Sequence, residues 1–330
     1  MDFDLTEDQK EIKSTARSLL EARSPWAKVR EASESGAYDD ALYKEVSELG
    51  WPGIAVAEEH GGQGLGAVEL SVLLEELGYA VAASPFLPTA AAASIIQAQG
   101  SSEQQSRWLP GLASGEQTAG IGTRELAADA ADAAVIVLIG DDGSLELIDR
   151  ADADVEDRQT VDGTRRTARV SGDGEPLDGT ADRFYAALAA EVVGLSQRAL
   201  DMTLEYVKDR KQFGTPVGAF QAVSHRCAEM LRYVESTRST AYFAAWAADA
   251  DPERFAEAAA LAAAAAADGG RETTASAIQA HGGIGFTWEA DVHWMYKRAQ
   301  LDTQLLGGSR KHKATLARIA GERAAQASAA

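Results

Sequence analysis

Arginine, glutamine and phenylalanine side chains gather in residues 209–221, where a turn joins two expected helices. The stretch reads Asp-Arg-Lys-Gln-Phe-Gly-Thr-Pro-Val-Gly-Ala-Phe-Gln. Functional side chains often lie on loops that a rigid scaffold positions, so Arg210, Phe213 and Gln221 mark a candidate binding site. The alternative is an ordinary helical corner, in which Phe213 and Phe220 are buried and Arg210 caps the last carbonyl groups. The corner by itself favours this ordinary alternative, and the rest of the chain must decide between the two.

The composition is that of an ordinary globular protein with a strong acidic excess. The 330 residues are 45% hydrophobic and 25% charged, and 31 basic against 51 acidic residues give a net charge of −20. A chain of this length buries a substantial core and is expected to divide into two or three domains. Nucleic-acid surfaces need basic stripes, so the charge argues against a nucleic-acid partner. A local basic pocket for a small phosphate-bearing ligand is compatible with it.

The sequence gives no sign of a disulfide, a metal site, a secretion signal or a membrane span. Cys227 is the only cysteine, and it shares a helical face with Val223 and Met230. The five histidines lack metal-ligand spacing. The chain begins with polar residues, and its longest run of low polarity, residues 256–267, is too short to cross a bilayer. We therefore expect a cytoplasmic protein without membrane insertion.

Residues 1–117 are expected to form an N-terminal helical domain. Apolar residues recur at helical spacing, and Thr6 and Ser101 each begin a capping box, with glutamine three residues later. A glycine-rich loop at residues 61–66 is a second stretch that could approach a phosphate. It lacks both the P-loop lysine and the Rossmann spacing, so a tight turn that leads into a helix is the favoured interpretation.

The rest of the chain changes character twice. In residues 118–180, a β-branched run at 134–139, a turn and a second run at 145–148 predict a hairpin within a small antiparallel β domain. Residues 181–330 return to long amphipathic helices with short connections, which suggest a C-terminal four-helix bundle. The predicted fold is therefore mostly α with a small β domain in the middle.

Several stretches, together covering nearly the whole chain, resemble the acyl-CoA dehydrogenase family. The order of a helical part, a small β middle and a C-terminal bundle is unusual and similar to that family. The most specific motifs are Arg-Lys-Gln-Phe-Gly at 210–214, Phe-Gln at 220–221 and Gln-Ala-His-Gly-Gly-Ile-Gly at 279–285, in this order and spacing. Weaker matches lie at residues 3–9, 49–51, 61–64 and 75–78.

The resemblance implies an FAD-dependent oxidation of an acyl-CoA thioester between Cα and Cβ. A carboxylate removes the α proton while the β hydrogen leaves as a hydride to the flavin, and hydrogen-bond donors stabilise the developing enolate. The flavin supplies the redox chemistry, and the protein supplies position and electrostatics. The resemblance also implies an oligomer and electron-transferring flavoprotein as the acceptor.

In the family, residues that match Arg210 and Phe213 lie against the pyrophosphate and adenine half of FAD, largely that of a neighbouring subunit. A planar guanidinium suits a pyrophosphate because two charge-assisted hydrogen bonds form at once. Glycines let backbone amides approach the cofactor closely. The cofactor-binding residues implied by the resemblance are Arg210, Gln212, Phe213, Phe220, Gln221, Gln279, Gly282 and Gly283.

The positions where this family carries its catalytic base hold no carboxylate. Many members place a Glu before a glycine between the last two helices, and that position falls on Leu306 or Gly307. Other members place the Glu on the helix that leads into the Arg-x-x-Phe-Gly corner, and that position falls on Phe184. Asp182 and Glu191 lie near it as weak candidates for a displaced base. A solvated Asp at a helix start and a surface or buried, paired Glu are the favoured interpretations.

The β domain is shorter than the resemblance implies. Members usually have a Thr-Glu-Pro-like turn followed by Gly-Ser-Asp, and a strand with an aromatic residue that covers the flavin ring. Residues 122–129 read Gly-Thr-Arg-Glu-Leu-Ala-Ala-Asp, and no tryptophan lies between Trp108 and Trp246. The chain keeps the residues that, in the family, contact the flavin of a neighbouring subunit. It lacks those that contact the flavin of the same subunit. This pattern resembles the short, non-canonical subunit of actinobacterial heterotetrameric acyl-CoA dehydrogenases, often for steroid side-chain CoA esters.

The same residues are compatible with three alternative functions. One is a self-sufficient homo-oligomeric acyl-CoA dehydrogenase with a displaced base. Another is a flavin monooxygenase or nitroalkane-oxidase-like relative on the same fold, because fold does not fix chemistry. The third is a flavin-free scaffold that binds a partner or CoA, and the joint presence of Arg210, Phe213, Gln221 and Gln279 argues against it.

Overall fold

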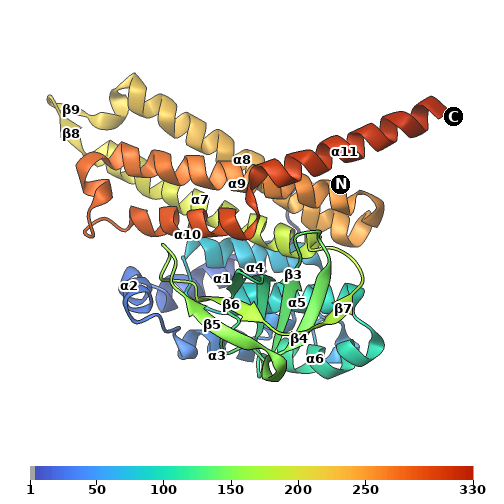
Figure 1. Cartoon of the computed structure of the whole chain (residues 1–330). Helices are drawn as coiled ribbons and strands as arrows, with labels where there is room; N and C mark the ends of the chain where they lie inside the picture. Colours follow the sequence, from blue (N-terminus) through green and yellow to red (C-terminus); the bar gives the residue numbers. More distant parts are fainter. Residues whose placement is uncertain (1–3, 330) are drawn as a thin grey trace.

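Long helices form one layer of the molecule, and a second layer combines shorter helices with a twisted sheet (Figure 1). The computed structural model describes residues 4–329. Phe3, where the first family-like stretch begins, lies outside the described residues. None of the helices within residues 4–329 has both the length and the low polarity that crossing a bilayer requires.

Six α-helices precede the sheet in the described part of the chain. Both predicted capping boxes are confirmed, since Thr6 Oγ1 and Ser101 Oγ each accept a hydrogen bond from the backbone of the third helical residue at 3.2 Å. The loop at 61–66 is a tight turn that leads into a helix, as expected. The helices are α1 (Glu7–Arg23), α2 (Trp26–Ser35), α3 (Asp40–Glu48), α4 (Ala67–Tyr79), α5 (Phe86–Gln99) and α6 (Ser102–Ser114), with short 3-10 turns η1 (Trp51–Gly53) and η2 (Glu58–His60).

The described residues of the middle part form a seven-stranded sheet in the order β5-β6-β2-β1-β3-β4-β7. The predicted hairpin is confirmed as the β3–β4 ladder. The expectation of a purely antiparallel sheet is wrong in one ladder, because β1 and β3 run parallel. The chain reverses after β1 and again after β2, so β3 runs in the same direction as β1. β3 pairs with the edge of β1 opposite to the edge that pairs with β2. The strands are β1 (Ala119–Thr123), β2 (Leu126–Ala128), β3 (Val135–Ile139), β4 (Leu145–Asp149), β5 (Asp154–Arg158), β6 (Thr167–Ser171) and β7 (Glu175–Leu177), with η3 (Arg150–Asp152) after β4.

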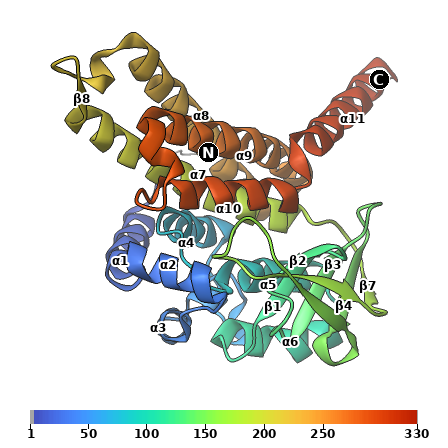
Figure 2. The same ribbon diagram turned by 60° about the vertical axis from the view of Figure 1, so that its left-hand side comes forward.

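The C-terminal helices form a bundle with one additional helix. The four helices α7, α8, α9 and α10 make the bundle, in which α9 contacts each of the other three. The last helix, α11, contacts α9, and its end stands clear of the body (Figures 1 and 2). Their bounds are α7 (Asp182–Asp209), α8 (Gln221–Ala250), α9 (Pro252–His281), α10 (Val292–Leu305) and α11 (Gly308–Ala329).

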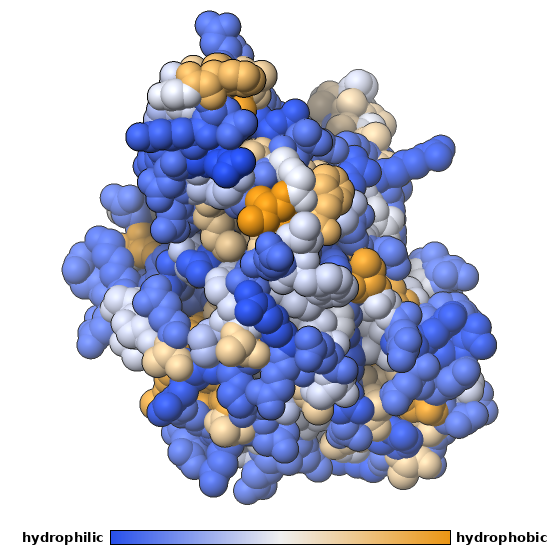
Figure 3. All heavy atoms as spheres, turned by 90° about the vertical axis from the view of Figure 1, so that its left-hand side faces the viewer, coloured by the Kyte–Doolittle hydropathy of each residue, from blue (hydrophilic) through white to orange (hydrophobic). Residues whose placement is uncertain are grey.

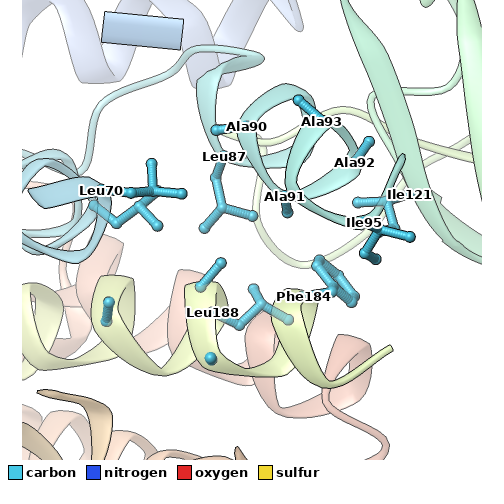
Figure 4. Close-up of a cluster of buried hydrophobic side chains, with 14 of the residues drawn as sticks. Leu70, Leu87, Ala90, Ala91, Ala92, Ala93, Ile95, Ile121, Phe184 and Leu188 are labelled. Carbon is cyan, nitrogen blue, oxygen red and sulfur yellow. The ribbon is translucent and has the colours of Figure 1, made fainter. Parts of the chain in front are cut away.

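A shared hydrophobic core joins the two layers. Phe184 and Leu188 of α7 lie across from Leu87 of α5 and Leu70 of α4 (Figure 4). Burial of such side chains contributes about 1.5–3 kcal/mol each relative to exposure. The crossing of α4 and α7 is unusually close, because a Cβ at Gly194 would lie 1.8 Å from a backbone oxygen of α4. The first half of α7 is therefore fixed against the N-terminal helices.

Candidate functional site

The turn between α7 and α8 stands out from one end of the bundle (Figure 1). It contains the short ladder of β8 (Lys211–Gln212) and β9 (Thr215–Pro216), followed by η4 (Val217–Ala219). Phe213 closes the ladder with φ of 52°, which is uncommon for a bulky residue, and its side chain is 96% exposed. Its ring meets the ring of the 40% exposed Phe220 edge to face at 6.5 Å between centroids. The alternative of a corner with both phenylalanines buried is therefore wrong.

The end of α9 brings the second group of expected cofactor residues to the same end of the bundle. Tyr206 of α7 stacks on His281 of α9 at 4.4 Å between ring centroids. α9 ends at His281, and η5 (Gly282–Phe286) follows. Figure 3 looks onto this end of the molecule, where hydrophobic areas interrupt a mostly hydrophilic surface. We define the bundle-end surface as the eight residues Arg210, Gln212, Phe213, Phe220, Gln221, Gln279, Gly282 and Gly283, of which all but the partly exposed Gly282 are exposed.

The backbone of the bundle-end surface is open to a ligand that approaches from outside. A Cβ at Gly282 or Gly283 would meet no atom within 4 Å. Gly282 has φ of 65° and ψ of −140°, a region that is essentially restricted to glycine. A guanidinium such as that of Arg210 can bind phosphate, and an exposed ring such as that of Phe213 can stack on an aromatic base. The bundle-end surface therefore suits a phosphorylated aromatic ligand that approaches from outside this chain.

Of the three sequence positions expected for a catalytic base, two lie in the interior of the chain, whereas Gly307 is exposed. Phe184 and Leu306 are fully buried in the same hydrophobic cluster. Gly307 follows with φ of 76° and begins the connection to α11. His312 of α11 hydrogen-bonds the Leu306 carbonyl oxygen at 2.7 Å and fixes this connection. Apolar packing thus occupies two of the positions where the resemblance would place a carboxylate, and the third is an exposed glycine.

Asp182 lies at the start of α7 and is only partly exposed. Its carboxylate accepts a hydrogen bond from Thr180 Oγ1 at 2.6 Å. Burial raises the pKa of Asp182, while the Thr180 hydrogen bond and the Lys311 charge oppose the rise. Of the two weak candidates for a displaced base, Asp182 is the one whose carboxylate does not pair with a guanidinium.

Glu191, the other candidate, belongs to a group of five buried charged side chains that connects the β5–β6 loop with α7 and α10. Arg165 donates to Glu191 and to Asp302 Oδ1, each at 2.7 Å. Arg298 donates to Glu191 at 2.8 Å and to Asp162 at 2.5 Å. Each of the five side chains is at most 3% exposed. We call these five residues the buried ionic cluster.

The buried ionic cluster contains three carboxylates and two guanidiniums. Burial, followed by repulsion from Glu191, raises the pKa of Asp302 well above its usual range, although Arg165 and Arg298 lower it. A proton on Asp302 makes the cluster electrically neutral, as the low dielectric of the interior favours. Because Glu191 pairs with both guanidiniums, its carboxylate is poorly placed to take a proton from a substrate.

Two family models match the chain on either side of the sheet. The description "Acyl-CoA dehydrogenase, N-terminal domain" matches residues 6–116, and "Acyl-CoA dehydrogenase, C-terminal domain" matches residues 182–321. Acyl-CoA dehydrogenase IpdE2 of Mycolicibacterium smegmatis is 34% identical over 316 residues, which cover 93% of this chain and 97% of the relative. The chain belongs to the acyl-CoA dehydrogenase family. IpdE2 of Mycobacterium tuberculosis is similarly close, at 35% identity over 92% of this chain and 95% of the relative.

Solved acyl-CoA dehydrogenase structures share the whole fold. A structure described as the Tcur3481-Tcur3483 steroid ACAD has a TM-score of 0.88 at 28% identity and covers 97% of this chain and 99% of its own. Butyryl-CoA dehydrogenase from Megasphaera elsdenii has a TM-score of 0.85 at 21% identity, with coverage of 97% and 99%, and shows the fold alone. The predicted order of helical part, β middle and helical bundle is confirmed. The two matched family segments leave out residues 117–181, which contain the sheet.

Members of the acyl-CoA dehydrogenase family are FAD-dependent, and the residues of this chain fit FAD unevenly. The bundle-end surface offers a guanidinium, carboxamides, an exposed aromatic ring and open glycine backbone, which suit the phosphates and adenine of FAD. The interior near Phe184 and Leu306 is filled by apolar side chains instead. The residues therefore fit an FAD that touches the outer surface of this chain better than an FAD that is buried inside it.

Of the buried ionic cluster, only Glu191 was singled out from the sequence. A signal was present on α10, where Val292, Met295, Asp302 and Leu305 repeat at the spacing of one buried helical face. A charged residue in register with such a face indicates a buried charge that needs a partner. Its partner Arg165 lies far along the chain, and only the fold brings the two together.

Proposed function

We propose that this chain is the half-site subunit of a heteromeric FAD-dependent acyl-CoA dehydrogenase. The observation that carries the proposal is the contrast between the bundle-end surface and the interior. Residues suited to FAD are exposed on the outside, whereas the base positions Phe184 and Leu306 are buried and apolar. A chain of this kind contributes to a flavin seated in its partner and supplies no base of its own.

The residues of this chain would bind and orient the cofactor. FAD, when bound, accepts the hydride from Cβ of the acyl-CoA. Arg210 would bind the pyrophosphate, Phe213 and Phe220 would contact the adenine side, and the amides near Gly282 and Gly283 would approach the nucleotide. The partner subunit holds the flavin ring and carries the base that removes the α proton.

The proposed substrate is a bulky acyl-CoA, of the class of steroid side-chain CoA esters. The similarity to a structure described as a steroid ACAD supports this class. A structure described as the ChsE4-ChsE5 complex from Mycobacterium tuberculosis shares the fold, with a TM-score of 0.86 at 24% identity over 98% of this chain and 99% of its own. Electron-transferring flavoprotein is the proposed acceptor.

Reconstitution of turnover tests the proposal. The chain purified alone is expected to show no acyl-CoA dehydrogenation, and the complex with its partner is expected to turn over. Asp182→Asn in this chain is expected to leave the turnover of the complex within about twofold, because the carboxylate of Asp182 takes no part in proton removal.

The same assay distinguishes the self-sufficient alternative with a displaced base. If Asp182 or Glu191 is that base, the chain alone turns over, and Asp182→Asn or Glu191→Gln lowers kcat by at least about a hundredfold. Turnover by the isolated wild-type chain would refute the half-site proposal. Glu191→Gln requires a thermal denaturation control, since Glu191 holds two buried guanidiniums.

A further inference from the structure

A cavity of about 530 Å³ lies between α3 and the loop that joins β2 to β3, away from the bundle-end surface. The polar side chains around it include Tyr38, Tyr43, Asp129, Asp132 and Arg166. Its volume falls within the range of about 300–1,000 Å³ that is typical of small-molecule sites. The acyl-CoA dehydrogenase activity proposed above does not use this cavity.

Hydrogen bonds hold the walls of the cavity in place. The backbone N–H of Ala134 donates to the Thr118 carbonyl at 2.8 Å, which ties the β2–β3 loop to the segment before β1. The N–H of Asp129 donates to the Arg166 carbonyl at 3.0 Å, and the N–H of Arg166 donates to the Tyr38 hydroxyl at 2.9 Å. Four segments of the chain are therefore fixed together, and the cavity is preformed.

Asp129 is a buried carboxylate with only one of its two oxygens paired. Its side chain accepts a hydrogen bond from the Tyr38 hydroxyl through Oδ1, whereas Oδ2 is buried and has no partner within residues 4–329. The residue is 6% exposed and has φ of 54°. Buried polar atoms without partners are rare in folded proteins, and each one points to a missing partner or a function.

Tyr43 is a second polar group beside the cavity. Its hydroxyl lies near the hydroxyls of Thr89 and Ser47 but makes no hydrogen bond to them in this structure. Burial, with a smaller contribution from the Asp129 charge, raises the pKa of Tyr43 to about 12, so the hydroxyl stays protonated. A neutral hydroxyl can accept a hydrogen bond from a bound ligand.

The charge of the cavity favours a cation. Asp40, Glu116, Asp129 and Asp132 line it, and the one lining guanidinium, Arg166, is paired with Asp132. No group of His, Cys, Asp and Glu side chains in the described range 4–329 is arranged to hold a metal ion. The apolar part of the lining is made of short side chains, namely Ala37, Pro85, Ala131, Ala133 and Ala134. An organic cation with a short aliphatic body matches this combination.

We propose that this cavity binds a small aliphatic amine, whose ammonium group donates a hydrogen bond to Asp129 Oδ2. The Tyr43 hydroxyl is the second polar partner, and the alanine side chains contact the methylene groups. The ligand would give Asp129 Oδ2 the hydrogen-bond donor that it lacks within residues 4–329. Binding involves no covalent step, and the proposal does not rest on the half-site role.

Calorimetric titration with 1,4-diaminobutane tests this proposal, with 1,4-butanediol as the neutral compound of the same length. The titration uses the purified protein, with its partner if the two copurify, near physiological salt, because a chain of net charge −20 attracts cations nonspecifically. One diamine is expected to bind per chain, and the diol is expected to bind at least about tenfold more weakly, because it lacks the charge.

Asp129→Asn should weaken diamine binding at least about tenfold and should still fold, because asparagine tolerates positive φ. Thermal denaturation of the Asp129→Asn variant checks its folding. Tyr43→Phe should also weaken diamine binding, by a smaller factor. Glu48→Gln removes an exposed carboxylate from α3 outside the cavity and should bind the diamine like the wild type. Equal affinity of folded Asp129→Asn and wild type, or the absence of saturable diamine binding, would overturn the proposal.

Discussion

Arg298→Met is expected to lower the free energy of unfolding by about 3–5 kcal/mol. Arg298 is fully buried and binds Asp162 and Glu191 through two of its nitrogens. Methionine keeps much of the aliphatic volume but removes the charge, and it leaves two carboxylates with Arg165 as the remaining cation. The loss of one partner from a buried ion pair is costly because the other charge stays buried without compensation.

Urea unfolding of wild type and variant, followed by circular dichroism, measures this difference. Arg318→Met is the matched control, since the Arg318 side chain of α11 is 62% exposed and pairs with Glu322 one turn later. The control should change stability by less than about 0.5 kcal/mol. Asp302→Asn should also have a small effect, because it leaves two carboxylates with two guanidiniums in the buried ionic cluster. A loss below about 1 kcal/mol for Arg298→Met would contradict the buried ionic cluster as described.

Arg210→Ala is expected to weaken FAD binding by the heteromeric complex about 10- to 100-fold. The proposed contact is a charge-assisted hydrogen bond to the pyrophosphate, and such bonds contribute about 1.5–3 kcal/mol. Arg210 is exposed at the turn after α7, so its removal should leave the stability of the chain nearly unchanged. Loss of cofactor without loss of fold is the signature of a binding residue.

FAD release on dilution, followed by flavin fluorescence, measures the effect of Arg210→Ala. Arg232→Ala is the control, because Arg232 is also an exposed arginine of the same region, on α8, where it pairs with Glu229. It should retain FAD like the wild type. Unchanged FAD affinity of the Arg210→Ala complex would show that the bundle-end surface does not contact the cofactor.

The fold was largely predictable from the sequence because its signals are local. Capping boxes at Thr6 and Ser101, the hairpin turn before Leu145 and the glycine loop at 61–66 each determine structure within a few residues. The parallel ladder of β1 and β3 was not predicted. The direction of β3 follows from the two chain reversals after β1 and β2. Neighbouring residues do not encode the side of β1 on which each strand pairs.

The exposure of the candidate site was harder to predict than its residues. Phe213 is a large apolar residue next to a turn, so burial was the reasonable expectation, yet it is 96% exposed. The reason lies in tertiary structure, because the end of α7 and the start of α8 extend beyond the rest of the bundle (Figure 1). The partners of Glu191 were hidden for the same reason, since Arg165 and Arg298 come from segments far along the chain.

The stoichiometry of flavin to protein in the purified complex tests the half-site role most directly. The complex and the chain alone are denatured, the released FAD is quantified by absorbance, and each chain is quantified by amino-acid analysis. We expect one FAD for each pair of this chain with its partner, and little FAD on this chain alone. One FAD for every copy of this chain when it is purified without a partner would contradict the half-site role.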